Sequence, residues 1–157
     1  MKKSILLLVL LCATLLLMTA CSNSDTPKDV ALDKVMKEIE TSITLPESMT
    51  DLTAGDLTRL YGIESAQYVQ FAGKVTNIGI LGDEIVIVEA SSAAAATEIK
   101  QQMEKRYQSK LNEMDNYLPD EHAKITAGRV VQNGNFVAML INAEQATLDK
   151  LYDDAVK

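Results

Sequence analysis

Residues that serve cross-links and metal sites are scarce in this chain. Its 157 residues include two cysteines, one histidine and no tryptophan. Cys12 lies inside an apolar run near the N-terminus, so a chain that loses this run keeps only Cys21. A single cysteine excludes an internal disulfide and any metal site made of several thiolates. The folded part must therefore be held together by packing.

Basic residues are also in the minority. Lys and Arg number 15 against 22 Asp and Glu, which gives a net charge of −7. Loss of Lys2 and Lys3 with the N-terminal run would make the chain more acidic. Nucleic-acid binding rewards neutralisation of phosphates by Lys and Arg, and anionic lipid head groups attract the same residues. The sequence therefore predicts no nucleic-acid partner and no electrostatic attraction to a membrane surface.

Familiar catalytic motifs are missing from the sequence. It contains no Gly-x-Ser-x-Gly elbow, no His-Glu-x-x-His, no phosphate-binding glycine loop and no Cys-x-x-Cys. His122 follows Asp120 and Glu121, but adjacent helical residues point in different directions and rarely bind one ion together. The pair Asp153-Asp154 lacks the rest of a calcium loop. The sequence predicts no cofactor and no metal, and it does not indicate an enzyme.

The longest apolar run, residues 5–18, is shorter than the roughly 20 residues that a membrane-spanning helix needs. It follows two lysines, which is the layout of a signal peptide. The run closes on Leu17-Met18-Thr19-Ala20-Cys21, which resembles a bacterial lipobox, although Met18 stands where leucine is commoner. We expect signal-peptidase cleavage between Ala20 and Cys21 and lipidation of Cys21. An uncleaved N-terminal anchor helix is the alternative.

The boundaries of the chain's parts follow from this motif. Residues 1–20 are predicted to be a lipoprotein signal peptide. Small polar residues and one proline fill the next stretch, which predicts a flexible tether over residues 21–28. Residues 29–157 are long enough for one domain with a real core and too short for two. We therefore expect a single α+β domain there.

Apolar residues recur at helical spacing in several segments. We expect a first helix capped by Asp29, a loop over residues 41–53 and a short helix over residues 54–61 that ends at Gly62. A long helix over residues 93–116 should be capped by Ser91 or Ser92. A short helix should begin at Pro119. Asn142 should cap a last helix, with Gln145 at the reciprocal capping position.

Strand patterns lie between these helices. Residues 66–75 alternate in part, and residues 84–90 form a β-branched run typical of a central strand covered on both faces. Asn133-Gly134 separates residues 129–132 from residues 135–141, which is a strong hairpin signal. The sequence predicts an α+β fold with a four-stranded, mainly antiparallel sheet made of two β-pairs. The sheet should pack against the long helix, with helices at the N- and C-terminal ends.

Five stretches of the sequence also carry a family resemblance. They are Leu57-x-x-Leu60-Tyr61-Gly62-Ile63, Asp83-Glu84-Ile85-Val86-Ile87-Val88, Ala96-x-Glu98-Ile99-x-x-x-Met103-x-x-Arg106-x-Gln108, Tyr117-Leu118-Pro119 and Val130-Val131-Gln132-Asn133-Gly134-Asn135-Phe136-Val137. Together they resemble the domain of unknown function 4358 family, small lipoproteins mainly of Firmicutes, over about residues 31–154. The resemblance implies a Gram-positive host and a lipid anchor on the outer face of the cell membrane. It implies no catalytic residue, because the family has no established activity.

Arg106 and Tyr107, near the middle of the predicted long helix, are the candidate binding residues. An arginine there can bind a carboxylate in a groove, or it can cover apolar surface with its stem. We expect a membrane-anchored, non-catalytic module that binds an unidentified envelope protein or a small ligand. The alternatives are an envelope enzyme with a site built from Glu84, Glu89 or Asp120, and a small solute-binding receptor.

Overall fold

The computed structural model describes residues 29–115 and 118–157. The predicted signal peptide, the cleavage and lipidation site at Ala20 and Cys21, and the predicted tether lie outside the described residues. Within the described ranges, no helix combines the length and the apolar character that crossing a bilayer would require.

A five-stranded antiparallel sheet forms the centre of the fold, with the strand order β1-β2-β3-β5-β4. The strands are β1 (Met49–Asp51), β2 (Tyr68–Thr76), β3 (Glu84–Ala90), β4 (Arg129–Asn133) and β5 (Phe136–Ile141). The prediction of four strands was wrong by one, because β1 lies in the segment that we expected to be a loop. This strand has only three residues and no alternation of its own, and it exists through its pairing with the far end of β2.

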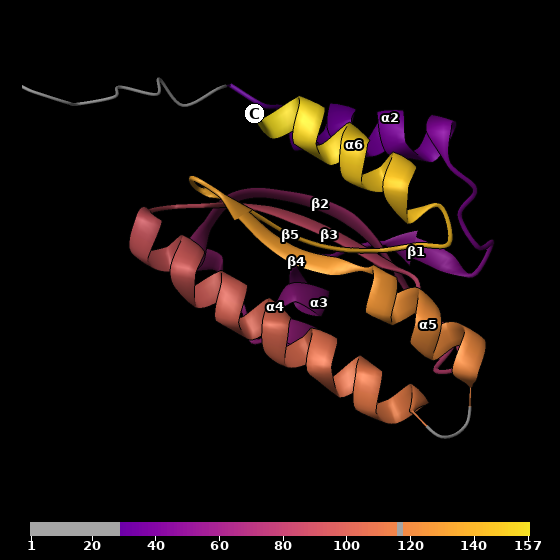
Figure 1. Ribbon diagram of the computed structural model, residues 1–157. Helices are drawn as coiled ribbons and strands as arrows, with labels where there is room; N and C mark the ends of the chain where they lie inside the picture. The colour runs from indigo at the N-terminus through magenta and orange to yellow at the C-terminus, as the bar shows by residue number, and fades with distance from the viewer. Residues whose placement is uncertain (1–28, 116–117) are drawn as a thin grey trace, which may run out of the picture.

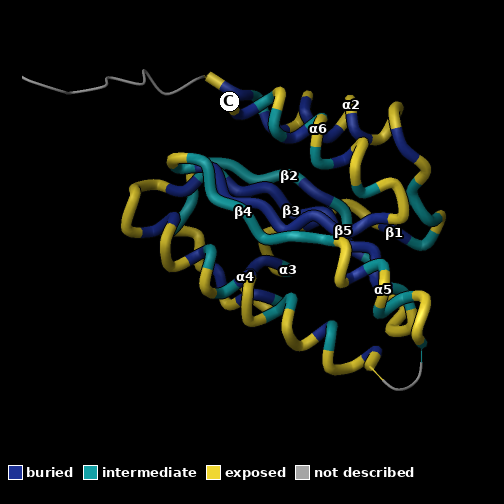
Figure 2. The backbone as a smooth tube through the Cα atoms, in the orientation of Figure 1, coloured by how far each residue is buried: buried dark blue, intermediate teal, exposed yellow. Residues whose placement is uncertain are grey.

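Helices cover both faces of the sheet (Figure 1). On one face lie α2 (Leu32–Ser42) and α6 (Gln145–Val156), and on the other lie α4 (Ala93–Met114) and α5 (Pro119–Ala127). Strand β3 is buried on both sides: Ile85 and Ile87 face α2 and α6, whereas Val86 and Val88 face α4. This two-sided burial accounts for the unbroken β-branched run and confirms the predicted central strand. Figure 2 shows the sheet as the most buried layer.

The predicted short helix over residues 54–61 is present, but it has two parts. It begins with α3 (Ala54–Asp56), where Thr53 and Asp56 form a capping box. It continues as a π-helical turn, η2 (Leu57–Tyr61). Gly62 ends this turn with φ of +73°, as the glycine predicted. A π-helical turn is rare and is often found at functional sites.

The start of α2 differs from the prediction. Asp29 does not cap it, since the N-cap position is Ala31 and carries no side-chain cap. Instead, the backbone N–H of Leu32 donates to Oε1 of Gln70 on β2 at 3.1 Å. Nε2 of Gln70 in turn donates to the Val30 carbonyl at 2.8 Å. A side chain 38 positions away in the sequence therefore accepts the hydrogen bond of a free backbone N–H at the start of the helix. The local sequence cannot reveal such a partner.

Two further predictions, the cap of α4 and the turn between β4 and β5, are confirmed, whereas the predicted cap of the last helix is wrong. Ser92 Oγ accepts from the backbone N–H of Ala95 at 3.1 Å at the start of α4. Gly134 has φ of +59° in the β4–β5 turn. The last helix begins at Gln145 and its N-cap position is Glu144, not Asn142. Asn142 Oδ1 instead accepts from the Glu144 N–H at 2.8 Å in the turn before the helix, and Gln145 Oε1 accepts from the Asn142 N–H at 3.1 Å.

Candidate functional site: a buried ion cluster between β3 and α4

A carboxylate is buried at the start of the central strand. Glu84 is the first residue of β3 and is fully buried. It belongs to the side of β3 that also carries Val86 and Val88, and it faces α4. A buried carboxylate is costly unless it is paired and hydrogen-bonded, so its partners decide whether this arrangement is stable.

Two basic side chains from α4 reach Glu84, and they lie one helical turn apart on the same face. Arg106 binds the carboxylate with two hydrogen bonds, from Nε to Oε1 at 3.1 Å and from Nη2 to Oε2 at 3.0 Å. Lys110 Nζ donates to Oε2 at 2.8 Å. The Lys110 side chain is only 4% exposed and that of Arg106 is 21% exposed. Arg106 therefore lies between the buried carboxylate and solvent.

The fourth member of the cluster comes from the π-helical turn. The buried Tyr61 hydroxyl donates a hydrogen bond to Oε1 of Glu84. Burial, and then the charge of Glu84, raise the pKa of Tyr61 well above its ordinary value of 10.0, so the hydroxyl keeps its proton. We call Tyr61, Glu84, Arg106 and Lys110 the Glu84 cluster.

The electrostatics of the cluster favour an ionised Glu84. Burial by itself would raise the pKa of Glu84, but the hydrogen bond from Arg106 and the charges of Lys110 and Arg106 outweigh it. The pKa is held below its ordinary value of 4.5. Each carboxylate oxygen accepts two hydrogen bonds, one from Arg106 and one from either Tyr61 or Lys110. This saturates the carboxylate, so it has no free site for a reacting proton.

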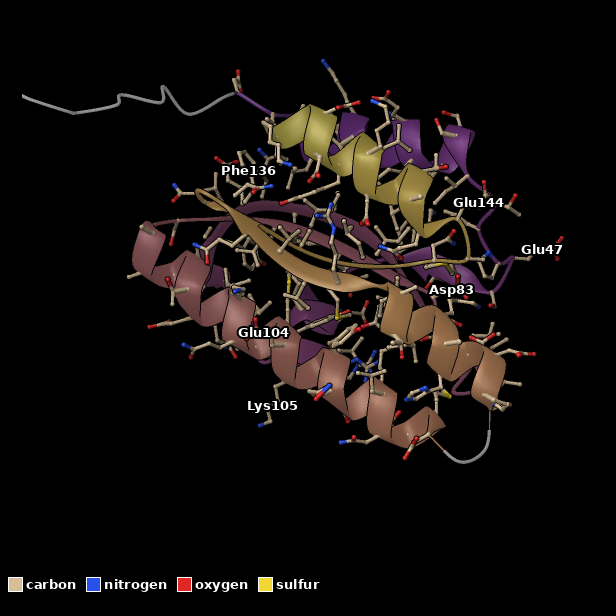
Figure 3. All side chains as sticks on the ribbon, in the orientation of Figure 1. Glu47, Asp83, Glu104, Lys105, Phe136 and Glu144 are labelled. Atoms are coloured by element: carbon tan, nitrogen blue, oxygen red, sulfur yellow. The ribbon has the colours of Figure 1, made fainter. Side chains whose placement is uncertain are left out.

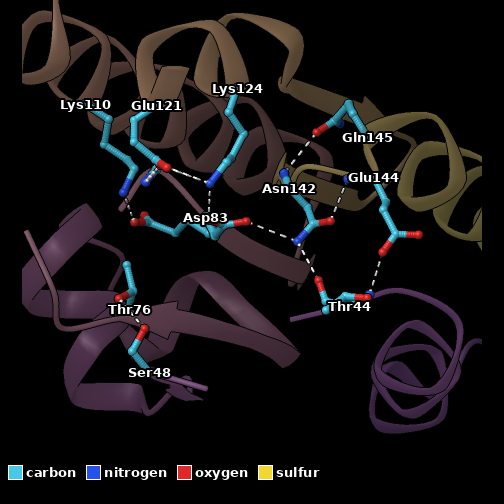
Figure 4. Close-up of polar contacts among 12 residues, drawn as sticks. Thr44, Ser48, Thr76, Asp83, Lys110, Glu121, Lys124, Asn142, Glu144 and Gln145 are labelled. Carbon is cyan, nitrogen blue, oxygen red and sulfur yellow. Dashed lines mark hydrogen bonds and ion pairs between the residues drawn. The ribbon is translucent and has the colours of Figure 1, made fainter. Parts of the chain in front are cut away.

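A second polar network begins at the adjacent residue, Asp83, which is 1% exposed (Figure 4). Its Oδ2 accepts from Lys124 Nζ on α5 at 2.6 Å, and its Oδ1 accepts from Asn142 Nδ2 after β5 at 3.1 Å. Asn142 Nδ2 also donates to the Thr44 carbonyl at 3.3 Å. This network joins the connections around one end of the sheet, so we interpret it as structural.

The structure separates the acidic residues that we considered for catalysis. Glu84 faces α4, whereas Glu89 accepts from Gln70 Nε2 at 2.6 Å on the side of α2. Asp120 is exposed on α5. Because Glu84 and Glu89 lie on opposite faces of the sheet, they cannot act as a pair on one substrate.

The remaining candidates have ordinary structural surroundings. The Tyr107 hydroxyl donates to the Ile125 carbonyl at 2.7 Å and so holds α5 against α4. His122 Nε2 lies 3.8 Å from Asp115 Oδ1, while Glu121 accepts from the Gly82 N–H and from Lys124. Over residues 29–115 and 118–157, no group of three or more His, Cys, Asp or Glu side chains could hold a metal ion.

Sequence reasoning identified Arg106 but missed Lys110 and the role of Glu84. One signal was available: Lys110 follows Arg106 by four residues, on the helical face next to the apolar stripe. A second was the charge at the start of a strand whose other residues predict complete burial. Neither signal says which carboxylate meets which base, because that depends on how α4 lies across β3.

The fold and the site define a small α+β domain whose sheet lies between two helical layers, with a buried cluster of charges. Residues 41–142 match the family described as Domain of unknown function (DUF4358), and the chain belongs to this family. The matched range includes all four residues of the Glu84 cluster. The chain matches no curated protein and no solved structure.

Proposed function

We propose that the protein is an extracytoplasmic lipoprotein, held at the outer face of a Gram-positive cell membrane by lipid on Cys21. Its domain would serve as a non-catalytic binding or accessory module for an envelope protein or a small ligand. The observation that carries the anchoring is the sequence Leu17-Met18-Thr19-Ala20-Cys21 after a short apolar run with a basic start. Two or more acyl chains on one residue are enough for stable anchoring.

The arrangement of the domain is compatible with such an anchor. The start of α2 and the end of α6 lie at the same end of one helical layer (Figure 1). Seven residues separate Cys21 from Asp29, and a flexible stretch of that length reaches on the order of 15 Å. This end would therefore lie nearest the head groups.

The test is substitution of the acylated cysteine. We expect the Cys21→Ser protein to lack the mass that acyl chains add to the N-terminal residue. It should be either released from membranes or left with its signal peptide uncleaved. Cys12→Ser is the matched control, because Cys12 would leave with the signal peptide; it should be lipidated and membrane-bound as the wild type is. Mass spectrometry of the native protein measures the lipidation, and cell fractionation measures the attachment to the membrane. A Cys21→Ser protein that stays in the membrane at the mature size would refute the anchor.

A further inference from the structure

We propose that the Glu84 cluster is a binding site for a small oxyanion, a carboxylate or phosphate group, held by Arg106 and Lys110 on the side turned away from Glu84. This inference rests on the binding part of the proposed function and names the chemistry of the ligand. It is independent of the lipid anchor, which can fail without affecting it.

The Glu84 cluster contains more cations than contacting carboxylates. Two cations, Arg106 and Lys110, share the single carboxylate of Glu84, so one positive charge has no contacting carboxylate of its own. Among the described residues, no other carboxylate forms an ion pair with either cation. The charge of Glu113, farther along α4, also raises the pKa of Arg106. Glu113 is exposed and accepts a hydrogen bond from Ser109 at 3.0 Å, so solvent screens its charge and it does not act as a contacting anion. A buried charge without a counter-charge is unfavourable, so an anion would complete the cluster.

Arg106 and Lys110 also have more N–H donors than Glu84 uses. An ammonium group has three N–H bonds and a guanidinium has five. Glu84 is the only acceptor in the described ranges that takes hydrogen bonds from these two side chains, and it uses one N–H of Lys110 and two of Arg106. The other N–H bonds of both groups necessarily point elsewhere. Unsatisfied donors on a side chain as buried as Lys110 call for an acceptor.

The guanidinium of Arg106 has one edge that does not contact Glu84. It uses Nε and Nη2 for Glu84, which leaves the Nη1 edge of the planar fork to face another partner. A guanidinium fork matches carboxylate and phosphate oxygens well. Because Arg106 is the partly exposed member of the cluster, a ligand would meet it first and reach Lys110 next. Glu84 and Tyr61 then act as positioning residues that hold the fork in place.

The experiment titrates full-length protein, purified in mild detergent, with sodium acetate and separately with sodium phosphate. Sodium chloride keeps the ionic strength constant, because exposed charges respond to salt alone. Binding is followed by the side-chain NMR signal of Arg106 Nε and by the midpoint of thermal unfolding. We expect a saturable shift of the Arg106 signal and a rise in the midpoint with at least one anion. A response to acetate alone would identify a carboxylate ligand, and a response to phosphate alone would identify a phosphate ligand.

The variant Lys110→Met removes the excess charge and should abolish the saturable response. Lys105→Met is the matched control, because Lys105 is exposed on the same helix and points away from the sheet (Figure 3); it should bind as the wild type does. The proposal is overturned if neither anion saturates the Arg106 signal of the wild type, which would mean that water satisfies the free donors. Equal binding by Lys110→Met would overturn it as well. The wild-type NMR titration decides the question even if Lys110→Met fails to fold.

Discussion

Glu84→Gln is the sharpest test of the reasoning about the buried cluster. The substitution keeps the size and shape of the side chain and removes its charge. Arg106 and Lys110 then remain at the interface between β3 and α4 with no carboxylate between them. The glutamine amide can still accept through its single oxygen, but its NH₂ group is a donor that faces other donors. The free energy of unfolding therefore falls for two reasons: the attraction to the carboxylate is lost, and a new repulsion between donors is added.

The structure sets the expected size of this loss. Removing one partner of a buried ion pair destabilises proteins by about 3–5 kcal/mol, because an uncompensated charge is left behind. Glu84 is fully buried and Lys110 is 4% exposed, so solvent screens this pair little. Domains of this kind have a total stability of about 5–15 kcal/mol. We therefore expect Glu84→Gln to remove a large share of the free energy of unfolding.

Urea denaturation followed by circular dichroism measures the effect. Glu104→Gln is the control, because Glu104 is half-exposed on α4 and pairs with Lys100 at 3.3 Å; it should cost at most about 1 kcal/mol. Lys110→Met leaves a balanced pair of Glu84 and Arg106 and should cost much less than Glu84→Gln. The double variant should be more stable than Glu84→Gln alone. If Glu84→Gln costs no more than the control, the cluster does not carry the energy that we assign to it.

Two further predictions concern pH and packing. The pKa of Glu84 lies below its ordinary value of 4.5 in the folded state. Its contribution to stability should therefore be complete at neutral pH and should be lost as the pH falls from 4.5 through the lower pKa of the folded state. The difference in unfolding free energy between wild type and Glu84→Gln should shrink from pH 7 to pH 3.5, and a constant difference would contradict this. Gly73→Ala should destabilise the protein by several kcal/mol or prevent folding, because its Cβ would lie 2.2 Å from the backbone oxygen of Ile85. Overpacking among side chains costs about 1–3 kcal/mol, and a clash with the backbone should cost more because the backbone of a central strand cannot move aside. Gly79→Ala is the control, since nothing lies within 4 Å of its Cβ, and equal thermal midpoints for the two variants would refute the argument.

The sequence by itself determined the local structure and the family. Periodic apolar residues identified the helices, and the β-branched run from residue 84 to residue 90 identified the buried central strand. Ser92, Gly62 and the glycine of the β4–β5 turn were found in the predicted roles. These features depend on backbone preferences and on contacts within a few residues, so the sequence shows them directly.

Only the tertiary structure decided which distant residues meet. Strand β1 forms because β2 offers it a partner, and Gln70 takes the place at the start of α2 that local sequence assigned to Asp29. The Glu84 cluster joins residues from a π-helical turn, a strand and a helix, with Arg106 22 positions and Lys110 26 positions from Glu84. Charged residues in a sequence look alike whether they end in solvent or in the core. The position of α4 across β3 decides which of them are buried together. The interactions between the buried charges then set their pKa values and their contribution to stability.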